Sequence, residues 1–65
     1  MVIGSFYNAI RLYSVMLLSF VNMKLRDFYG SLDALCDDLD ADRREVEEKL
    51  KAINYEYDAQ KNQFV

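Results

Sequence analysis

Apolar residues recur every seven positions in the second half of the chain. The recurring positions form a predicted seam of Leu32, Cys36, Leu39, Val46, Leu50, Ile53, Tyr57 and Phe64. Only Arg43 and Gln60 interrupt the spacing. An a/d pattern sustained over several heptads is typical of a coiled-coil helix that buries one narrow stripe. We therefore expect a heptad helix that continues to about residue 64.

The first half of the chain is apolar around most of a predicted helix rather than along one stripe. One series with three-four spacing consists of Ile3, Phe6, Ile10, Tyr13, Leu17 and Phe20. Further apolar groups stand outside this series at Tyr7, Leu12, Val15, Met16, Leu18 and Met23. A helix that is apolar over most of its circumference has to be covered from several sides. The pattern predicts a helix at about residues 4–29 that one partner helix cannot cover.

Two places favour a break between these helices. At Gly30 and Ser31, glycine suits the end of a helix and serine is a strong N-cap for the next one. Alternatively, the turn lies in the acidic stretch 37–42, where Asp42 and Glu45 have the spacing of a capping box. A third alternative is one unbroken helix, since the heptad passes through the acidic stretch without a change of phase. The sequence favours the first of the three.

Together these patterns predict an all-α fold in which residues 1–65 form a single helical domain. The favoured architecture is a two-helix antiparallel hairpin, and the alternative is one long continuous helix in a coiled-coil oligomer. The chain has no proline and only two glycines, so the strongest helix breakers are nearly absent. With one cysteine and no histidine, neither disulfides nor zinc can stabilise so small a core. Oligomerisation or a partner is expected to complete the fold.

The charge is unevenly distributed. Residues 1–31 carry a net charge of +2, whereas residues 32–65 carry ten carboxylates and five basic groups, a net charge of −5. Binding of nucleic acid needs clustered Lys and Arg, so we expect no nucleic-acid partner. The aspartates at 37–42 do not fit a calcium loop, because Arg43 stands where glycine is required and Lys49 where the last glutamate should be. We expect no metal, no cofactor and no small-molecule substrate.

No residue set in the sequence has the pattern of a catalytic site. Cys36 has no histidine to activate it, and at a seam position it is expected to be a small buried hydrophobic residue. Carboxylates on a thin helical hairpin stay solvated, so their pKa values are not shifted for acid–base chemistry. Arg43, inside the seam, is expected to pack its stem and to reach an acid such as Glu47 with its guanidinium. We predict that the protein is not an enzyme.

The candidate partner-binding residues are those that the hairpin leaves outside its seam. On the first helix they are Tyr7, Val15 and Leu18, which would point away from the second helix. On the second helix Tyr55 lies two residues before the seam residue Tyr57 and would face elsewhere. Exposed apolar groups in such numbers are unusual on a monomer and normally mark an interface.

The predicted function is a non-catalytic protein–protein interaction module, such as a small assembly component, adaptor or co-chaperone. The partner would be another protein or a second copy of the chain. In size and two-helix layout the expected hairpin resembles the small helical co-chaperones of bacterial type III secretion needles, although no sequence motif carries that resemblance. A lone thiol fits a cytoplasmic location. Two alternatives are a membrane-associated protein that uses its apolar first helix, and an acidic regulatory or antitoxin-like protein.

Overall fold

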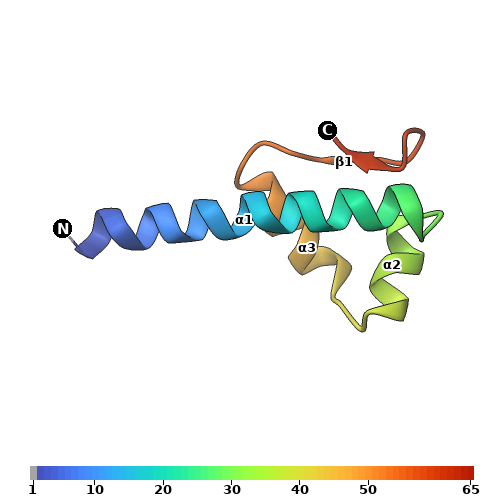
Figure 1. Ribbon diagram of the computed structural model, residues 1–65, viewed down its shortest axis with the longest axis horizontal. Helices are drawn as coiled ribbons and strands as arrows, with labels where there is room; N and C mark the ends of the chain where they lie inside the picture. Colours follow the sequence, from blue (N-terminus) through green and yellow to red (C-terminus); the bar gives the residue numbers. More distant parts are fainter. Residues whose placement is uncertain (1) are drawn as a thin grey trace.

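The computed structural model describes the backbone of residues 2–65 and the side chains of residues 11–65. The chain is mostly helical. Three helices are followed by two short strands: α1 (Val2–Asp27), α2 (Leu32–Asp38), α3 (Arg43–Lys51), β1 (Tyr57–Asp58) and β2 (Gln63–Phe64) (Figure 1). The strands pair antiparallel, with Tyr57 opposite Phe64. The prediction of a mainly helical protein is confirmed, and the strand pair is an addition to it.

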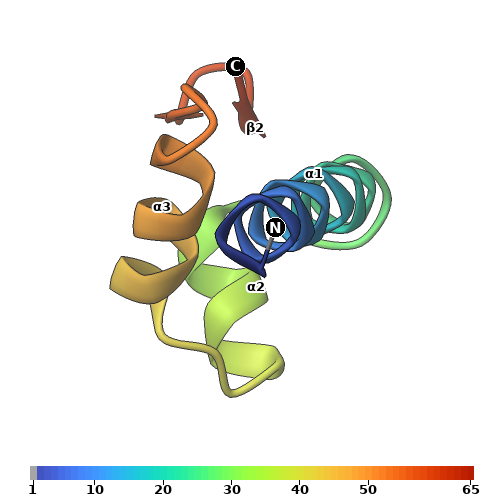
Figure 2. The ribbon, with the colours of Figure 1, turned by 90° about the vertical axis from the view of Figure 1, so that its left-hand side faces the viewer.

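Helix α1 runs along the longest dimension of the molecule, which measures 42 × 22 × 18 Å. Its N-terminal half extends beyond every other element (Figure 1), and its C-terminal half contacts α2, α3 and β2. Figure 2, viewed along α1, shows the strand pair above this helix, α3 beside it and α2 below it, with no element on the side away from α3. The opposite side of α1 is therefore left without a neighbour from the described part of the chain.

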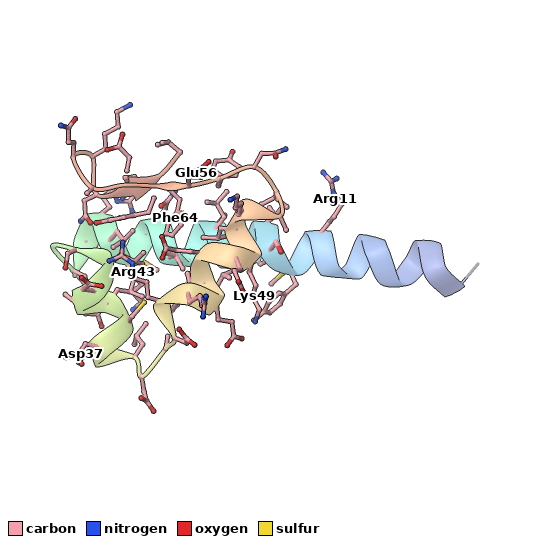
Figure 3. The ribbon with its side chains drawn as sticks, turned by 180° about the vertical axis from the view of Figure 1, so that it is seen from behind. Arg11, Asp37, Arg43, Lys49, Glu56 and Phe64 are labelled. Atoms are coloured by element: carbon pink, nitrogen blue, oxygen red, sulfur yellow. The ribbon has the colours of Figure 1, made fainter. Side chains whose placement is uncertain are left out.

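The core lies where the C-terminal half of α1 meets the other elements. Its buried members are Val21, Leu25, Leu32, Leu35, Cys36, Leu50 and Phe64. Figure 3 shows Phe64 over α1, whereas Asp37 lies at the outer edge of α2. The largest fully buried side chains come from all three helices: Val21 from α1, Leu32 and Leu35 from α2, and Leu50 from α3.

Helix α1 ends just before Gly30, but not by the mechanism that the sequence suggested. No glycine among the described residues has a positive φ, so Gly30 does not form a left-handed C-cap. Instead the side-chain amide of Asn62 donates to the carbonyls of Leu25 and Tyr29, at 3.1 and 2.9 Å. Leu25 belongs to the last turn of the helix, where backbone acceptors lack partners along the chain, and Tyr29 follows the helix by two residues. A residue 33 positions away supplies the cap for Tyr29.

Both predicted break points are real. Ser31 caps α2, because its hydroxyl accepts from the Ala34 N–H at 3.1 Å. Asp42 caps α3, because its carboxylate accepts from the Arg44 N–H at 3.0 Å. Between these two helices Asp40 has a φ of 55°, a left-handed conformation that aspartate tolerates better than most residues. The heptad spacing continues through residues 37–42 and therefore does not indicate the break between α2 and α3.

The predicted heptad helix to residue 64 is wrong beyond Lys51. Asn54 has a φ of 70° and Asn62 a φ of 53°, and each of these left-handed residues is incompatible with a continuing helix. The segment instead folds back as the strand pair, which the Glu56 and Val65 backbones extend by two hydrogen bonds. Tyr57 and Phe64 keep a ring contact across it, with centroids 5.5 Å apart.

The two-helix antiparallel hairpin is therefore not what the chain forms, and neither is one continuous helix. The seam residues are distributed over α2, α3 and the strand pair rather than along one helix. Leu32, Cys36, Leu50 and Phe64 are buried, and Val46, Ile53 and Tyr57 pack against them. Leu39 is an exception: it is 42% exposed, because α2 ends at Asp38 and the following turn changes the phase.

Candidate functional site

A row of large apolar side chains winds along α1, turning by about 40° around the helix at each step of four residues. Leu12, Met16 and Phe20 are spaced four residues apart, and Phe28 continues the row one residue beyond the helix. They are 61%, 64%, 44% and 67% exposed, respectively. Residues four apart stack on one side of a helix. We call these four residues the α1 ridge.

Lys24 fills the one position of the row that is not apolar. Its ammonium lies 5.6 Å from the centroid of the Phe20 ring and 4.7 Å from that of Phe28. The lysine stem therefore bridges the two rings, and its charge is held close to their faces. The row stays continuous from Leu12 to Phe28.

Part of the α1 ridge lies opposite the core. Ser14, Val21 and Leu25 are the buried residues of α1, and positions seven or eleven apart share a side of a helix. At about 100° per residue, Leu12 and Met16 fall on the other side of the helix, and Phe20 lies toward the edge of that side. Helix α1 is thus apolar on two opposite sides, and the fold of one chain covers only one of them.

The next row of the helix, Val15, Ser19 and Met23, lies beside the ridge. Two neighbouring rows on any α-helix enclose a groove between them. Ser19 is exposed and is the smallest side chain of the two rows. Rows of side chains four apart and the grooves between them are the surfaces by which helices pack on each other.

On its other flank the ridge meets a hollow between α1 and α3. This hollow has a volume of about 330 Å³, and Tyr13, Leu17, Ala41 and Val46 form its apolar part. The Lys49 ammonium lies 5.2 Å from the centroid of the Tyr13 ring and pairs with Glu45 at 2.8 Å. The uncovered apolar surface therefore extends from α1 to the edge of α3.

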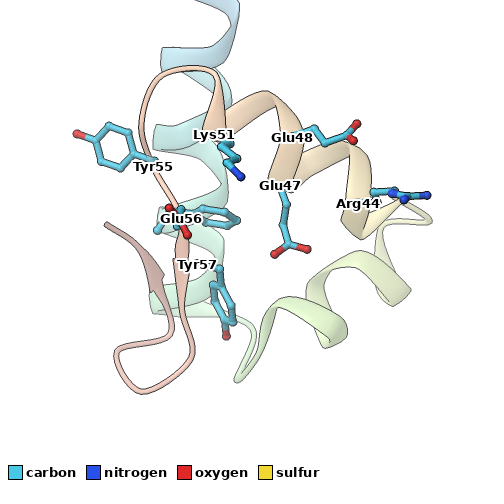
Figure 4. Close-up of a pocket in the computed structure, with 8 residues that line it drawn as sticks. Arg44, Glu47, Glu48, Lys51, Tyr55, Glu56 and Tyr57 are labelled. Carbon is cyan, nitrogen blue, oxygen red and sulfur yellow. The ribbon is translucent and has the colours of Figure 1, made fainter.

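A second hollow of about 290 Å³ lies between α3 and the strand pair. Tyr57 and Phe64 form part of it, and its charged residues are of both signs: Arg44, Lys51, Glu47, Glu48 and Glu56. In Figure 4, Glu47 and Tyr57 point toward the space between the elements, whereas Tyr55 points away from it. No residue that lines this hollow is a cysteine or a histidine.

Helices α2 and α3 are joined by the four residues 39–42, the layout of a helix-turn-helix, and a strand pair follows them. In DNA-binding proteins of this layout the second helix enters the major groove. Here the outward residues of α3 include Glu45 and Glu48 beside Arg44 and Lys51. Arg43 is held by Glu47 at 3.1 Å, as predicted, and by Asp33 at 2.7 Å. This face has no net positive charge to attract phosphates.

The candidate partner-binding residues from the sequence lie in different places. Val15 is exposed and borders the groove beside the α1 ridge. Leu18 is partly buried and packs against the core. Tyr55 is 36% exposed and lies far from the ridge in the chain, after α3. Tyr7 lies in α1, but its side chain is outside those that the structure describes.

Sequence reasoning did not single out the α1 ridge. Its members were counted among the apolar residues of the first helix, but the contacts with α2 and α3 decide which of them are left over. A signal did exist in the sequence: Leu12, Met16, Phe20 and Phe28 share one four-residue series that contains a single charged residue, Lys24.

Cys36 is buried in the core, 6% exposed, and its burial raises the pKa of the thiol. A thiol kept neutral is a poor nucleophile. We expect the folded protein to react with a thiol reagent at pH 8 at least tenfold more slowly than the urea-unfolded chain. Equal rates in the two states would contradict this burial.

The raised pKa of Cys36 also has a consequence for stability. Because the thiol ionises more readily in the unfolded chain, its contribution to stability is complete below about pH 8.5 and declines as the pH rises further. The difference in unfolding free energy between the protein and its Cys36→Ala variant should shrink from pH 7.5 to pH 10.

Comparison with known proteins places the chain in a family. A family model described as "Domain of unknown function (DUF4250)" matches residues 13–64. The chain belongs to the DUF4250 family. The DUF4250 match begins inside α1 and covers the rest of that helix, both shorter helices and the strand pair, including Met16, Phe20 and Phe28 of the ridge. No curated protein and no solved structure matched the chain.

Two further findings concern the described residues of this DUF4250 chain. None of its helices combines the length and the apolar character needed to cross a membrane. The described residues also contain no group of three or more His, Cys, Asp or Glu side chains placed to hold a metal ion.

Proposed function

We propose that this protein is a non-catalytic protein–protein interaction module that docks through the α1 ridge. The observation that carries the proposal is the position of the ridge. Leu12, Met16, Phe20 and Phe28 stay exposed after every other element has packed, and Leu12 and Met16 lie on the side of α1 opposite the core. Apolar side chains that stay exposed on a folded protein commonly form a protein–protein interface.

The area of the ridge supports the same proposal. A fully exposed side chain of this size offers about 200 Å². With the exposed fractions of its four members, the ridge presents roughly 450 Å² of apolar surface, before Tyr13 and Val15 are included. Patches of this size on a small soluble protein are commonly functional.

The charges favour a protein partner over nucleic acid. Ten carboxylates follow Leu32, and the outward face of α3 mixes acids with bases. The helix-turn-helix layout is therefore proposed to act as a support that fixes α1, with its surface charge keeping the module soluble. The resemblance to type III secretion co-chaperones rested on a two-helix layout that the chain does not have, so it is not part of the proposal.

The experiment is a comparison of three purified, tagged proteins: the unchanged chain, Met16→Glu on the ridge, and Leu39→Glu as a control. Leu39 is exposed like the ridge residues but lies at the end of α2. Each is used to capture proteins from cells, and any captured protein is then purified and its affinity measured directly. We expect Met16→Glu to weaken binding at least tenfold and Leu39→Glu to leave it unchanged, because only the former places a charge in the interface.

Hydrogen exchange on the purified complex locates the contact independently. Backbone amides of α1 between Leu12 and Phe28 should gain protection when the partner binds. Protection confined to α3 and the strand pair, with full affinity in Met16→Glu, would move the site to the hollow near Tyr55 and contradict the proposal.

A further inference from the structure

We infer that the α1 ridge is occupied by the α1 ridge of a second copy of this chain, so that the protein is a two-fold symmetric dimer. The inference rests on the proposed function and names its partner. Three properties support the dimer: the shape of α1, its charges and the area that the contact would bury.

Helix α1 has both a ridge and a groove on one face, and these are the two parts that a helix–helix contact needs. The ridge Leu12–Met16–Phe20 and the groove over Ser19 lie side by side on one helix. In a two-fold contact the ridge of each copy enters the groove of the other. The same surface of α1 therefore forms the contact on both copies. Rows four residues apart pack in this way at a crossing angle of about 50°, the commonest arrangement of helices in globular proteins.

The position of Ser19 decides where the helices cross. A side chain as small as serine lets two helix backbones approach most closely, and Met16 and Phe20 lie beside it on the ridge. A crossing at this point brings the Met16 side chains of the two copies near each other. Phe28 and the N-terminal half of α1 then lie on either side of the crossing.

The charges favour a second copy over an anionic lipid surface. The exposed stretch of α1 from Leu12 to Met23 has no charged residue, so two such faces meet without repulsion. The acidic part of each chain packs on the opposite side of α1, so the two acidic parts would face outward. A membrane surface, in contrast, would attract the three basic residues of α1 but repel the carboxylates that follow Leu32.

The area is adequate for a dimer. The ridge residues near the crossing, Leu12, Met16 and Phe20, present roughly 340 Å² of apolar surface per copy, so the two copies together bury roughly 700 Å². The bordering side chains Val15, Tyr13 and Met23 add to this and bring the total above the 1,000 Å² or so that a specific interface needs. The core of one chain consists of seven buried apolar residues, and small cores of this kind are commonly completed by oligomerisation.

The test is the mass of the full chain in solution, measured by sedimentation equilibrium between 5 and 200 µM protein. We expect a dimer, with twice the 7.6 kDa mass of one chain. Met16→Glu should raise the dissociation constant at least a hundredfold, and Ser19→Arg, which fills the groove, should do the same. Leu39→Glu is the matched control and should remain a dimer. Circular dichroism checks that each variant keeps the helical content of the parent.

Cross-linking tests where the copies meet. Met16→Cys should form an intermolecular disulfide under mild oxidation, whereas Leu39→Cys and the unchanged chain, whose Cys36 is buried, should not. A dimer that survives both Met16→Glu and Ser19→Arg would overturn the inference, and a dimer cross-linked through Leu39→Cys alone would do so too.

A monomer at 200 µM would also overturn the inference, and vesicle flotation separates the two reasons for it. If the monomer floats with phosphatidylcholine–phosphatidylglycerol vesicles and Met16→Glu does not, the ridge binds lipid, and the proposed protein-docking function fails with the dimer. If the monomer does not float, only the second copy is excluded, and the ridge remains a surface for a different protein.

Discussion

Replacing Leu50 with alanine is expected to lower the free energy of unfolding by about 2–5 kcal/mol, because it leaves a cavity in the centre of the core. Leu50 of α3 is fully buried, and it belongs to the hydrophobic core together with residues of α1, α2 and the strand pair. A domain of this size has about 3–10 kcal/mol of stability in total. Leu50→Asp, which adds a buried charge to the loss, should therefore be unfolded at room temperature.

The control for this experiment is Leu39→Ala. Both leucines belong to the heptad series, but Leu39 is 42% exposed. Urea unfolding followed by circular dichroism should show a change below about 1 kcal/mol for Leu39→Ala. If both substitutions lower the free energy of unfolding by the same amount, Leu39 would be as buried as Leu50. That result would fit a continuous heptad seam and contradict the three-helix core.

The second large effect is expected at Asn62, a polar residue near the end of the chain. Its amide nitrogen caps the carbonyls of Leu25 and Tyr29, and its oxygen accepts from the Tyr57 hydroxyl at 2.6 Å. The Tyr57 hydroxyl in turn accepts from the Leu32 N–H at 3.2 Å. Asn62 therefore joins the end of α1, the start of α2 and the strand pair.

Asn62→Ala should cost about 3–4 kcal/mol. Each of its three hydrogen bonds is worth about 1 kcal/mol, and alanine fits the left-handed backbone less well, by about 1 kcal/mol. Asn54→Ala is the control, since Asn54 is also left-handed, with a φ of 70°, but its exposed side chain makes no hydrogen bond in the described structure. Asn54→Ala should show the backbone cost alone, in the same urea measurement.

Asn62→Gly separates the two contributions further. Glycine accepts the left-handed conformation without strain, so this variant should lose the hydrogen bonds but avoid the steric cost of alanine. An Asn62→Ala variant no less stable than Asn54→Ala would show that the cap on α1 contributes nothing.

A second asparagine shows why the end of the chain folds back. The Asn22 side chain donates to the Phe64 carbonyl at 3.1 Å and accepts from the Phe64 N–H at 2.8 Å, as the backbone of a neighbouring strand would. The Gln63 side chain donates to the Asn22 carbonyl at 3.1 Å. These polar side chains fix Phe64 in the core from a helix 42 residues away, so the strand pair depends on α1.

The sequence alone determined the local features of this protein. Helix content followed from the absence of proline and from apolar periodicity, and the caps at Ser31 and Asp42 were readable because capping depends on residues only two or three positions apart. Which leucines and aromatics reach the core was also largely predictable, since Leu32, Leu50 and Phe64 are buried whichever elements carry them. The excess of apolar surface on the first helix was visible as well.

The tertiary structure decided how these parts are arranged. The heptad spacing is equally compatible with one helix and with three separate elements. The left-handed residues Asp40, Asn54 and Asn62 and the long-range hydrogen bonds of Asn22 exclude the former. The uncovered side of α1 could not be assigned either, because it depends on where α2 and α3 pack. A side chain such as Met16 becomes a candidate contact only when the rest of the chain has covered the opposite side of its helix.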